Sequence, residues 1–265
     1  MTGTVSRRST PAHIAITGAG AGIGAALALA YARSGARLSL SGRNLERLEQ
    51  TAGLCRARGA KVDVGQCDVT DAAAMQGWID RIEAEQPIDI LIANAGIGGS
   101  GTLTDNVAEA GEVARAVVTT NTIGVINTVT PVLPHFVARK AGTVVIISSV
   151  AGFLGLPDSP SYSASKAAAS VYGDGLRRLL RPQGIQVTVV SPGYVETAMS
   201  ASLPFHRPFL WSAEKAANVI QNAVANGRGE LIFPWQFRLA ISLARVLPTA
   251  FVDFLLMRFR AWDVL

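Results

Sequence analysis

Short apolar segments that alternate with segments of helical composition set the strongest constraint on how this chain folds. We expect strands at 13–17, 38–40, 61–67, 88–93, 143–149, 186–191 and 230–233. We expect helices at 25–34, 44–58, 71–85, 104–130, 160–181 and 212–226. Such alternation is typical of a parallel sheet whose two faces are both covered by helices. The pattern therefore predicts an α/β fold with a seven-stranded parallel sheet.

The length and composition fit one folded domain. Of the 265 residues, 49% are apolar and 16% are charged, which is enough apolar material for a full core and argues against disorder. We predict a single domain over residues 1–265. The net charge of +5 comes from basic residues that are spread among acidic ones, and this pattern does not indicate a nucleic-acid partner.

The cysteines and the N-terminal segment bear on metals and on the cellular compartment. Cys55 and Cys67 form neither a C-x-x-C pair nor a cluster with histidine, so we expect free thiols and no metal site. Residues 1–11 are not followed by an apolar stretch of signal-peptide length. No run of about 18 uninterrupted apolar residues occurs either. We therefore expect a cytoplasmic protein.

A glycine-rich turn, Gly18-Ala19-Gly20-Ala21-Gly22-Ile23-Gly24, joins the first expected strand to the first expected helix. Glycines allow a tight turn and let a phosphate approach the backbone N–H groups at the start of a helix, where the helix dipole also favours an anion. Glycine-rich turns also occur in purely structural loops, so this motif alone is a weak signal.

A tyrosine and a lysine four residues apart, Tyr162 and Lys166, follow Ser149 by thirteen and seventeen positions. If 160–181 is a helix, Tyr162 and Lys166 lie on one face of it. An ammonium about 4 Å from a phenol, at an effective dielectric constant of about 20, is worth about 3 pK units. We therefore expect Lys166 to lower the pKa of Tyr162 toward neutrality, where a general acid/base works best. Taken alone, this common pattern is more often an exposed helical pair.

Two further asparagines stand at informative positions. Asn94-Ala95-Gly96 ends the fourth expected strand, at the carboxyl edge where ligands bind in open α/β sheets. Asn121 lies inside an expected helix, where asparagine is unfavourable, so we expect it to have a hydrogen-bond partner or a functional role.

The order and spacing of these motifs resemble those of the short-chain dehydrogenase/reductase family, in its single-domain branch, from about residue 13 to about residue 233. Thr17-Gly18 with Gly22-Ile23-Gly24 resembles the T-G-x-x-x-G-x-G loop of the family, and Asn94-Ala95-Gly96 resembles its N-A-G motif. Four residues, namely Asn121, Ser149, Tyr162 and Lys166, resemble its catalytic tetrad. The resemblance implies a Rossmann-like, doubly wound fold and an NAD(P)(H)-dependent enzyme.

The resemblance also implies the cofactor-binding residues and the chemistry. The implied cofactor-binding residues are Gly18, Gly20, Gly22, Ile23, Gly24, Arg43, Asp68, Val69, Asn94, Ala95, Gly96, Tyr162, Lys166, Pro192, Gly193, Val195 and Thr197. Ser149 and Tyr162 would polarise a carbonyl, and Tyr162 would exchange a proton with the alcohol oxygen. Lys166 would assist Tyr162, and Asn121 would hold a water that links Lys166 to solvent. In the family the long helices around Asn121 and Tyr162 usually form a dimer.

The cofactor preference depends on the residues after the second strand. An NAD-specific member would present an acidic residue there, but this chain reads Ser41-Gly42-Arg43. Arg43 can offer a planar fork of donors to a 2′-phosphate, so we expect NADP(H), with NAD(H) as the alternative. The basic residue that some NADP-using relatives carry in the glycine loop is absent, because Ala21 stands there.

The substrate and the extent of turnover stay open at this stage. Apolar side chains after the fifth and sixth strands indicate a lipophilic carbonyl or alcohol, or simply core packing: Leu154, Leu156, Tyr194, Met199, Leu203, Phe205 and Phe209. The residues from 198 to 211 lack periodicity and suggest a loop. The alternative to an enzyme is a nucleotide-binding sensor or scaffold with the same fold and little turnover.

The tail, residues 235–265, lies beyond the family resemblance and has the composition of an apolar helical extension. Its first helix is apolar except for Arg238 and Arg245, which share one face. The domain core, a second subunit or a bilayer surface could each cover such a segment. We expect a homodimer whose tail covers the active-site side, with peripheral membrane contact through 235–265 as the alternative.

Overall fold

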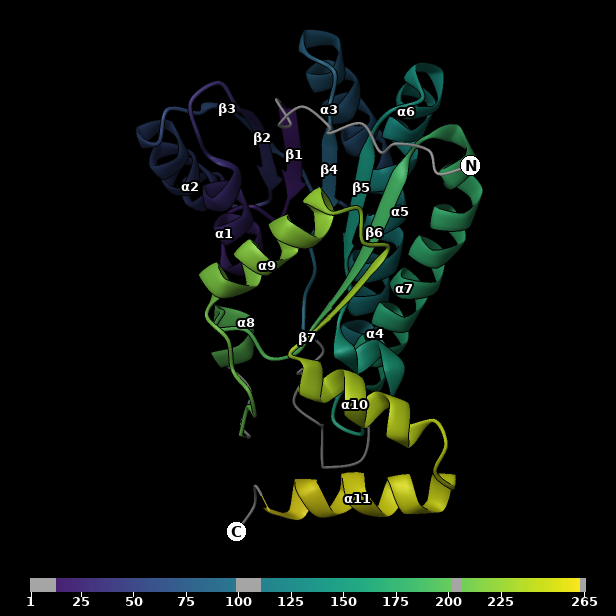
Figure 1. Cartoon of the computed structure of the whole chain (residues 1–265). Helices are drawn as coiled ribbons and strands as arrows, with labels where there is room; N and C mark the ends of the chain where they lie inside the picture. The colour runs from purple at the N-terminus through teal and green to yellow at the C-terminus, as the bar shows by residue number, and fades with distance from the viewer. Residues whose placement is uncertain (1–12, 99–110, 202–205, 263–265) are drawn as a thin grey trace.

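A computed structural model of the chain describes residues 13–98, 111–201 and 206–262, and a single parallel sheet organises them (Figure 1). Its strands lie in the order β3-β2-β1-β4-β5-β6-β7. They are β1 (His13–Thr17), β2 (Arg37–Gly42), β3 (Lys61–Gln66), β4 (Ile90–Ala93), β5 (Thr143–Ile147), β6 (Gln186–Pro192) and β7 (Glu230–Phe233). The strand order reverses direction between β1 and β4, and such a switch point is where ligands bind in doubly wound sheets. The predicted Rossmann-like fold is confirmed.

Helices cover both faces of the sheet because successive strand residues point to opposite sides. Ile14 and Ile16 of β1 pack with α1 (Gly22–Tyr31), α2 (Leu45–Ala57) and α9 (Ala213–Ala225). Ala15 lies in the other core, with α3 (Ala72–Glu85), α5 (Gly124–Val129) and α7 (Pro160–Leu180). Figure 1 shows these two helical layers on either side of the strands.

The expected helix at 104–130 differs in both its limits and its form. Its first part, 104–110, lies outside the described residues. The described part consists of α4 (Gly111–Val118), a π-helical turn (Thr119–Ile123), α5, a 3₁₀ turn (Thr130–Val132) and α6 (Leu133–Arg139). The helical path continues past Pro131 and Pro134 because each proline stands in the first turn of a new segment, where no N–H bond is lost.

Among the described residues, one helical stretch, Gly111–Arg139, is long and apolar enough to cross a membrane, with a mean hydropathy of 1.3. Thr and Asn side chains interrupt this stretch, so it holds no run of 18 uninterrupted apolar residues. Half of its most apolar window is buried inside the protein, where Val125, Val129 and Phe136 belong to the core beside α3 and α7.

Several expected boundaries shift by a few residues, and the expected loop at 198–211 contains a short helix. This helix, α8 (Ala198–Ala201), is held by Ser200, whose Oγ donates to Val195 O at 2.6 Å. Residues 202–205 of the loop lie outside the described part of the chain. The fifth strand stops at Ile147, so Ser149 belongs to the following loop and caps a 3₁₀ turn, Val150–Phe153.

The tail forms two helices beyond the carboxyl ends of the strands, α10 (Trp235–Ala244) and α11 (Thr249–Trp262) (Figure 1). α10 begins directly after β7, and Pro248 separates it from α11. The candidate site residues also follow the carboxyl ends of strands, so the tail and the site lie at the same edge of the sheet.

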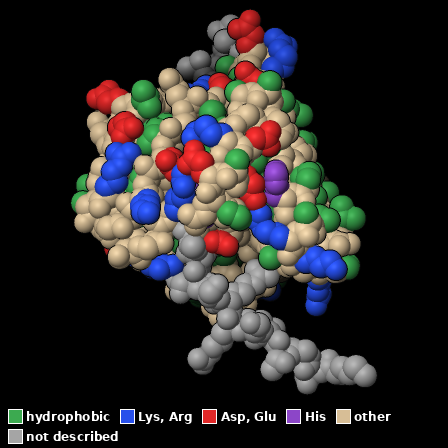
Figure 2. Space-filling view, turned by 90° about the horizontal axis from the view of Figure 1, so that it is seen from above, with side chains coloured by type: hydrophobic (Ala, Val, Ile, Leu, Met, Phe, Trp, Pro, Cys, Tyr) green, Lys and Arg blue, Asp and Glu red, His purple; other side chains and the backbone are tan. Residues whose placement is uncertain are grey.

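The opposite end of the molecule carries both signs of charge. Figure 2 shows this end, at the amino ends of the strands, with Lys and Arg side chains interleaved with Asp and Glu. Arg37 pairs there with Asp63 and Glu85, and Arg139 pairs with Glu83. These pairs compensate the local charge, so this face does not form a uniformly basic surface.

Candidate active site

The candidate residues converge at the carboxyl edge of the sheet because each follows a strand of the parallel set. The glycine turn follows β1, Asn94-Ala95-Gly96 follows β4, Ser149 follows β5, and Gly193 follows β6. The π-helical turn before α5 and the helix α7 bring Asn121, Tyr162 and Lys166 to the same place, as the contacts described below show.

The glycine turn depends on glycine at several positions. Gly18 and Gly22 have φ angles of +67° and +54°, in the left-handed region that other residues rarely adopt. A Cβ on Gly24 would overlap Gly18 O, and one on Gly22 would lie 2.9 Å from Thr197 Cγ2. The turn is therefore packed against itself and against the loop after β6, and larger side chains do not fit.

Asn94 attaches the end of β4 to the glycine turn. Its Nδ2 donates to Thr17 O at 3.0 Å and to Gly18 O at 3.2 Å. In return, Thr17 Oγ1 accepts from the backbone N–H groups of Asn94 and Ala95 at 3.1 and 3.2 Å. These bonds hold the two loops on either side of the switch point in one arrangement.

Asn121 stands in the π-helical turn and is fully buried. Its Oδ1 accepts from Ile97 N at 2.8 Å, and its Nδ2 donates to Ile97 O at 3.0 Å and to Ser165 Oγ at 3.1 Å. The expectation that a mid-helix asparagine has hydrogen-bond partners is met. π-helical turns within α-helices often occur at functional sites.

Ser149, Tyr162 and Lys166 lie together, as their spacing predicts. The side chains of Ser149 and Tyr162 are hydrogen-bonded to each other. Lys166 is buried, donates from Nζ to Ile147 O at 3.0 Å, and has its Nζ 5.8 Å from the centroid of the Tyr162 ring. A Cβ on Gly96 would lie 3.3 Å from Lys166 Nζ and 3.1 Å from Asn121 Oδ1, so the loop after β4 meets both side chains here.

The electrostatics of the pair differ from the expectation. Desolvation raises the pKa of Tyr162, and the hydrogen bond with Ser149 only partly offsets this. Burial also lowers the pKa of Lys166 to about 8. The expected decrease of the Tyr162 pKa by Lys166 is therefore not found, because burial disfavours the charged forms of both groups. This desolvation depends on everything packed around the two side chains, so their spacing along a helix does not reveal it.

Arg43 and Asp68 lie close together after β2 and β3, the two strands at one end of the sheet order. Arg43 Nη1 lies 3.9 Å from Asp68 Oδ2, and the Arg43 side chain is 66% exposed, so it is available to a ligand. Partial burial alone would raise the pKa of Asp68, but hydrogen bonds from Thr70 and the charge of Arg43 lower it. Beside Asp68, Val69 packs tightly against Gly124.

The loop after β6 connects the glycine turn to the tail. Its Val195 is buried, and Thr197 touches the glycine turn as described above. A Cβ on Gly193 would lie 2.5 Å from Phe237 of α10. The Phe237 ring makes edge-to-face contacts with Tyr194 and Phe209, at centroid distances of 6.1 and 5.9 Å. α10 therefore packs directly on the loop after β6.

Of the predicted apolar residues, Tyr194 and Phe209 join this aromatic cluster. Met199 lies next to Gly98, whose added Cβ would be 3.3 Å from Met199 Cγ. Leu154 and Leu156 are half-buried in the loop after the 3₁₀ turn. The remaining two, Leu203 and Phe205, lie outside the described residues.

The expectation that the tail covers the active-site side named no contact residue of α10 or of the position that follows it. Besides Phe237, Arg245 places its guanidinium 5.3 Å from the centroid of Phe153, which follows Ser149 by four positions. The signal in the sequence was the apolar composition of the tail, which does not say which element it covers.

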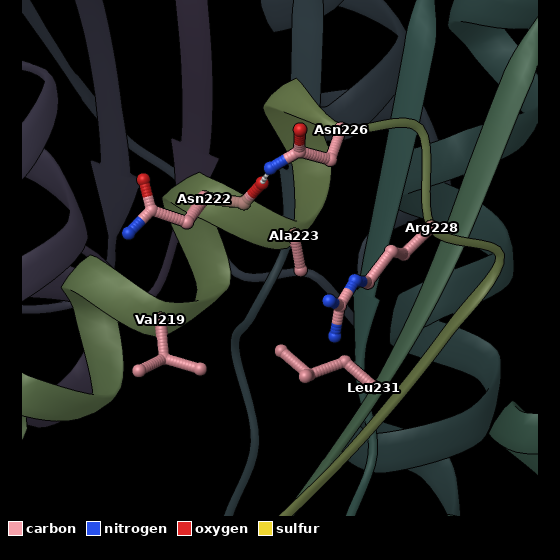
Figure 3. Close-up of a pocket in the computed structure, with 6 residues that line it drawn as sticks. All are labelled: Val219, Asn222, Ala223, Asn226, Arg228 and Leu231. Carbon is pink, nitrogen blue, oxygen red and sulfur yellow. Dashed lines mark hydrogen bonds between the residues drawn. The ribbon is translucent and has the colours of Figure 1, made fainter.

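A separate hollow lies between α9 and β7 and is lined by Val219, Asn222, Ala223, Asn226, Arg228 and Leu231 (Figure 3). Asn226 Nδ2 donates to Asn222 O at 2.7 Å, so part of its polar lining is already hydrogen-bonded within the helix. Arg228 and Leu231 stand before and early in β7, away from the carboxyl ends of the strands where ligands bind in such sheets. This hollow contains none of the candidate site residues.

Comparison with known proteins decides the family. The family model described as short chain dehydrogenase matches residues 12–207. The chain belongs to the short-chain dehydrogenase family. An uncharacterized oxidoreductase of Myxococcus xanthus is 37% identical over 239 residues, which cover 90% of this chain and 93% of that protein. Dehydrogenase/reductase SDR family member 7B of Mus musculus is 35% identical over 196 residues, which cover 72% of this chain and 60% of that protein.

Solved structures of short-chain dehydrogenases agree with this membership. A short-chain dehydrogenase from Sphingobium yanoikuyae in complex with NADPH is 29% identical, with a TM-score of 0.76 over 88% of this chain and 93% of that one. A single-residue variant of actinorhodin polyketide ketoreductase with NADPH is 26% identical, with a TM-score of 0.76 over 85% and 97%. The protein is therefore an oxidoreductase of this family, whose members bind a nucleotide cofactor.

The residues present fit a dinucleotide. No side chain caps the first turn of α1 and no acidic residue stands in it, so its backbone N–H groups can meet a pyrophosphate. Gly18, Gly20, Gly22 and Gly24 carry no side chains that could block the approach of a phosphate to the backbone of the turn. Arg43 and Asp68 follow β2 and β3 at the same edge of the sheet, and Lys166 Nζ lies beside Gly96, which follows β4.

Proposed function

We propose that the protein is an NADPH-dependent reductase of lipophilic carbonyl compounds, with Tyr162 as the general acid. The observation that supports this best is the hydrogen-bonded pair of Ser149 and Tyr162 hydroxyls beside the buried Lys166, at the same edge of the sheet as the glycine turn. A raised pKa keeps Tyr162 protonated at neutral pH, and a protonated tyrosine is the form that donates.

The residues divide the chemistry as follows. A nicotinamide nucleotide held by the glycine turn and the residues after β4 and β6 would supply the hydride for the carbonyl carbon, and the electron pair of the C=O π bond would pass to oxygen. The Ser149 hydroxyl donates a hydrogen bond to that oxygen and stabilises its developing charge. Tyr162 transfers its proton to the oxygen, which gives the secondary alcohol. Lys166 stabilises the tyrosinate that remains, and Asn121 holds the adjoining loop through Ile97.

The aromatic cluster of Tyr194, Phe209 and Phe237 at the loop after β6 supports the proposal of a lipophilic substrate. The proposal is tested by following NADPH fluorescence with a panel of ketones that increase in chain length. Consumption that rises with apolar chain length supports it. If NADPH binds with a shift in fluorescence and no ketone or aldehyde is reduced, the alternative of a nucleotide-binding sensor is correct.

Arg43→Ala is expected to reduce the preference for NADPH over NADH. A charge-assisted hydrogen bond to phosphate is worth about 1.5–3 kcal/mol, so the ratio of kcat/KM values should fall about tenfold to hundredfold. Steady-state kinetics with both cofactors measures this ratio. Arg178→Ala is the matched control, because Arg178 stands on α7, is 68% exposed and lies 3.6 Å from Asp174. Equal use of NADH and NADPH by the wild type would contradict the proposed preference.

The tail offers a second test, of assembly. We propose a homodimer whose tail covers the active-site side, with peripheral membrane contact as the alternative. The apolar side chains Trp235, Leu239, Leu243 and Val246 are between 52% and 78% exposed in the single chain and lie on one face of the α10 path, so they need a partner surface.

Truncation after Pro234 is expected to yield a poorly soluble protein that retains Ser149, Tyr162 and Lys166. The reason is that removal of Phe237 exposes Tyr194 and the loop at Gly193. Light scattering and size-exclusion chromatography measure the result. A truncated protein that stays soluble, dimeric and active, and loses only its binding to anionic liposomes, would support the membrane alternative.

A further inference from the structure

Ser165 connects two parts of the site that are far apart in the sequence. It stands on α7 between Tyr162 and Lys166 and is 1% exposed. Its Oγ donates to Tyr162 O at 2.8 Å and accepts from Asn121 Nδ2 at 3.1 Å. Its carbonyl accepts from Thr122 Oγ1 at 3.3 Å. Two bonds therefore tie α7 to the π-helical turn at this one residue.

The bond to Ser165 completes the hydrogen bonding of the Asn121 amide. Each amide atom has a defined partner: Oδ1 accepts from Ile97 N, while the two Nδ2 protons go to Ile97 O and to Ser165 Oγ. Since Asn121 is fully buried, removal of the Ser165 hydroxyl would leave one N–H group without an acceptor. The amide would then be held only by its two bonds to Ile97, and Oδ1 would be less firmly placed.

The position of Asn121 Oδ1 matters because Oδ1 and Lys166 Nζ both lie close to Gly96. A single Cβ position on Gly96 lies 3.1 Å from Oδ1 and 3.3 Å from Lys166 Nζ, so both atoms border the same small space. Oδ1 has a second lone pair, which can accept a hydrogen bond from the ammonium directly or through one water. Oδ1 is thus a neutral acceptor placed to stabilise the charged form of Lys166, against the burial that lowers its pKa.

We propose that Ser165 is a positioning residue of the reaction, which acts by holding the Asn121 amide so that Oδ1 faces Gly96 and Lys166. This role rests on the proposed reductase activity. Through Asn121 and Lys166, Ser165 would support the proton donor Tyr162, although the Ser165 hydroxyl does not reach the reacting atoms.

A double-mutant cycle with Asn121→Ala tests this role. Ser165→Ala is expected to lower kcat about tenfold, with changes below about twofold in the KM for the ketone and in the Kd for NADPH, because only the support of the proton donor is lost. The double variant Asn121→Ala/Ser165→Ala should be no slower than Asn121→Ala alone, because residues that act through one another are not additive. Losses that multiply, or a wild-type kcat for Ser165→Ala, would overturn the inference.

Ser163→Ala is the matched control. Ser163 is also a buried serine of α7, and its Oγ accepts from Leu156 N at 3.1 Å, on the side of the loop after the 3₁₀ turn. Its removal should destabilise the fold to a similar extent, yet leave kcat within about twofold and show no coupling to Asn121. If the wild type shows no turnover at all, the proposed function fails. In that case the same cycle, measured by urea unfolding, still decides whether Ser165 holds Asn121: coupling supports it, and additivity contradicts it.

Discussion

Tyr162→Phe is expected to lower the turnover of ketones by about 10²–10⁴-fold while NADPH still binds, because the variant removes the proton donor with little change in volume. Ser149 keeps its place, since its Oγ also accepts from Ala151 N at 3.1 Å. Single-turnover kinetics should show that the hydride step itself is slowed. NADPH fluorescence measures binding separately, and its Kd should stay close to that of the wild type.

Tyr172→Phe provides the control for this prediction. Tyr172 is on the same helix, is partly buried against the core, and burial raises the pKa of its hydroxyl as it does for Tyr162. It is ten positions from Tyr162 and takes no part in the proposed chemistry. Loss of turnover in Tyr172→Phe alone, with Tyr162→Phe fully active, would contradict the assignment of the proton donor.

Gly24→Ala is expected to weaken NADPH binding about tenfold to hundredfold and to destabilise the fold by about 1–3 kcal/mol, the usual cost of overpacking. The new Cβ would overlap Gly18 O and would lie 2.5 Å from Asn94 Nδ2. Gly18 O is a backbone atom and cannot move aside alone, so the turn and the Asn94 bonds must both shift. Fluorescence titration with NADPH and urea unfolding measure the two effects.

Gly53→Ala separates a local collision from a general effect of glycine replacement. Gly53 lies inside α2, and its added Cβ meets nothing within 4 Å. Alanine is favoured over glycine in a helix interior by about 0.8–1.0 kcal/mol, so this variant should be slightly more stable and bind NADPH normally. A Gly24→Ala variant that behaves like Gly53→Ala would show that the glycine turn is not closely packed.

The order of strands and helices could be predicted because burial on both faces of a parallel sheet forces short apolar runs, and these are visible in the sequence. The limits of elements were less predictable where side chains compete for the backbone. Ser149 leaves β5 early since its Oγ caps the next turn, and the helical path continues through the prolines at 131 and 134, beyond its expected end at 130.

The sequence by itself determined the parallel α/β sheet and the glycine turn, because these depend on local patterns, and its resemblance to a known family grouped Asn121, Ser149, Tyr162 and Lys166. The tertiary structure alone decided the direction of the Tyr162 and Lys166 pKa shifts, since desolvation depends on everything packed around a group. It also decided that Phe237 packs on Gly193 and that Ser165 holds Asn121. These pairs are 44 residues apart in each case, and only the folded chain brings such distant residues into contact.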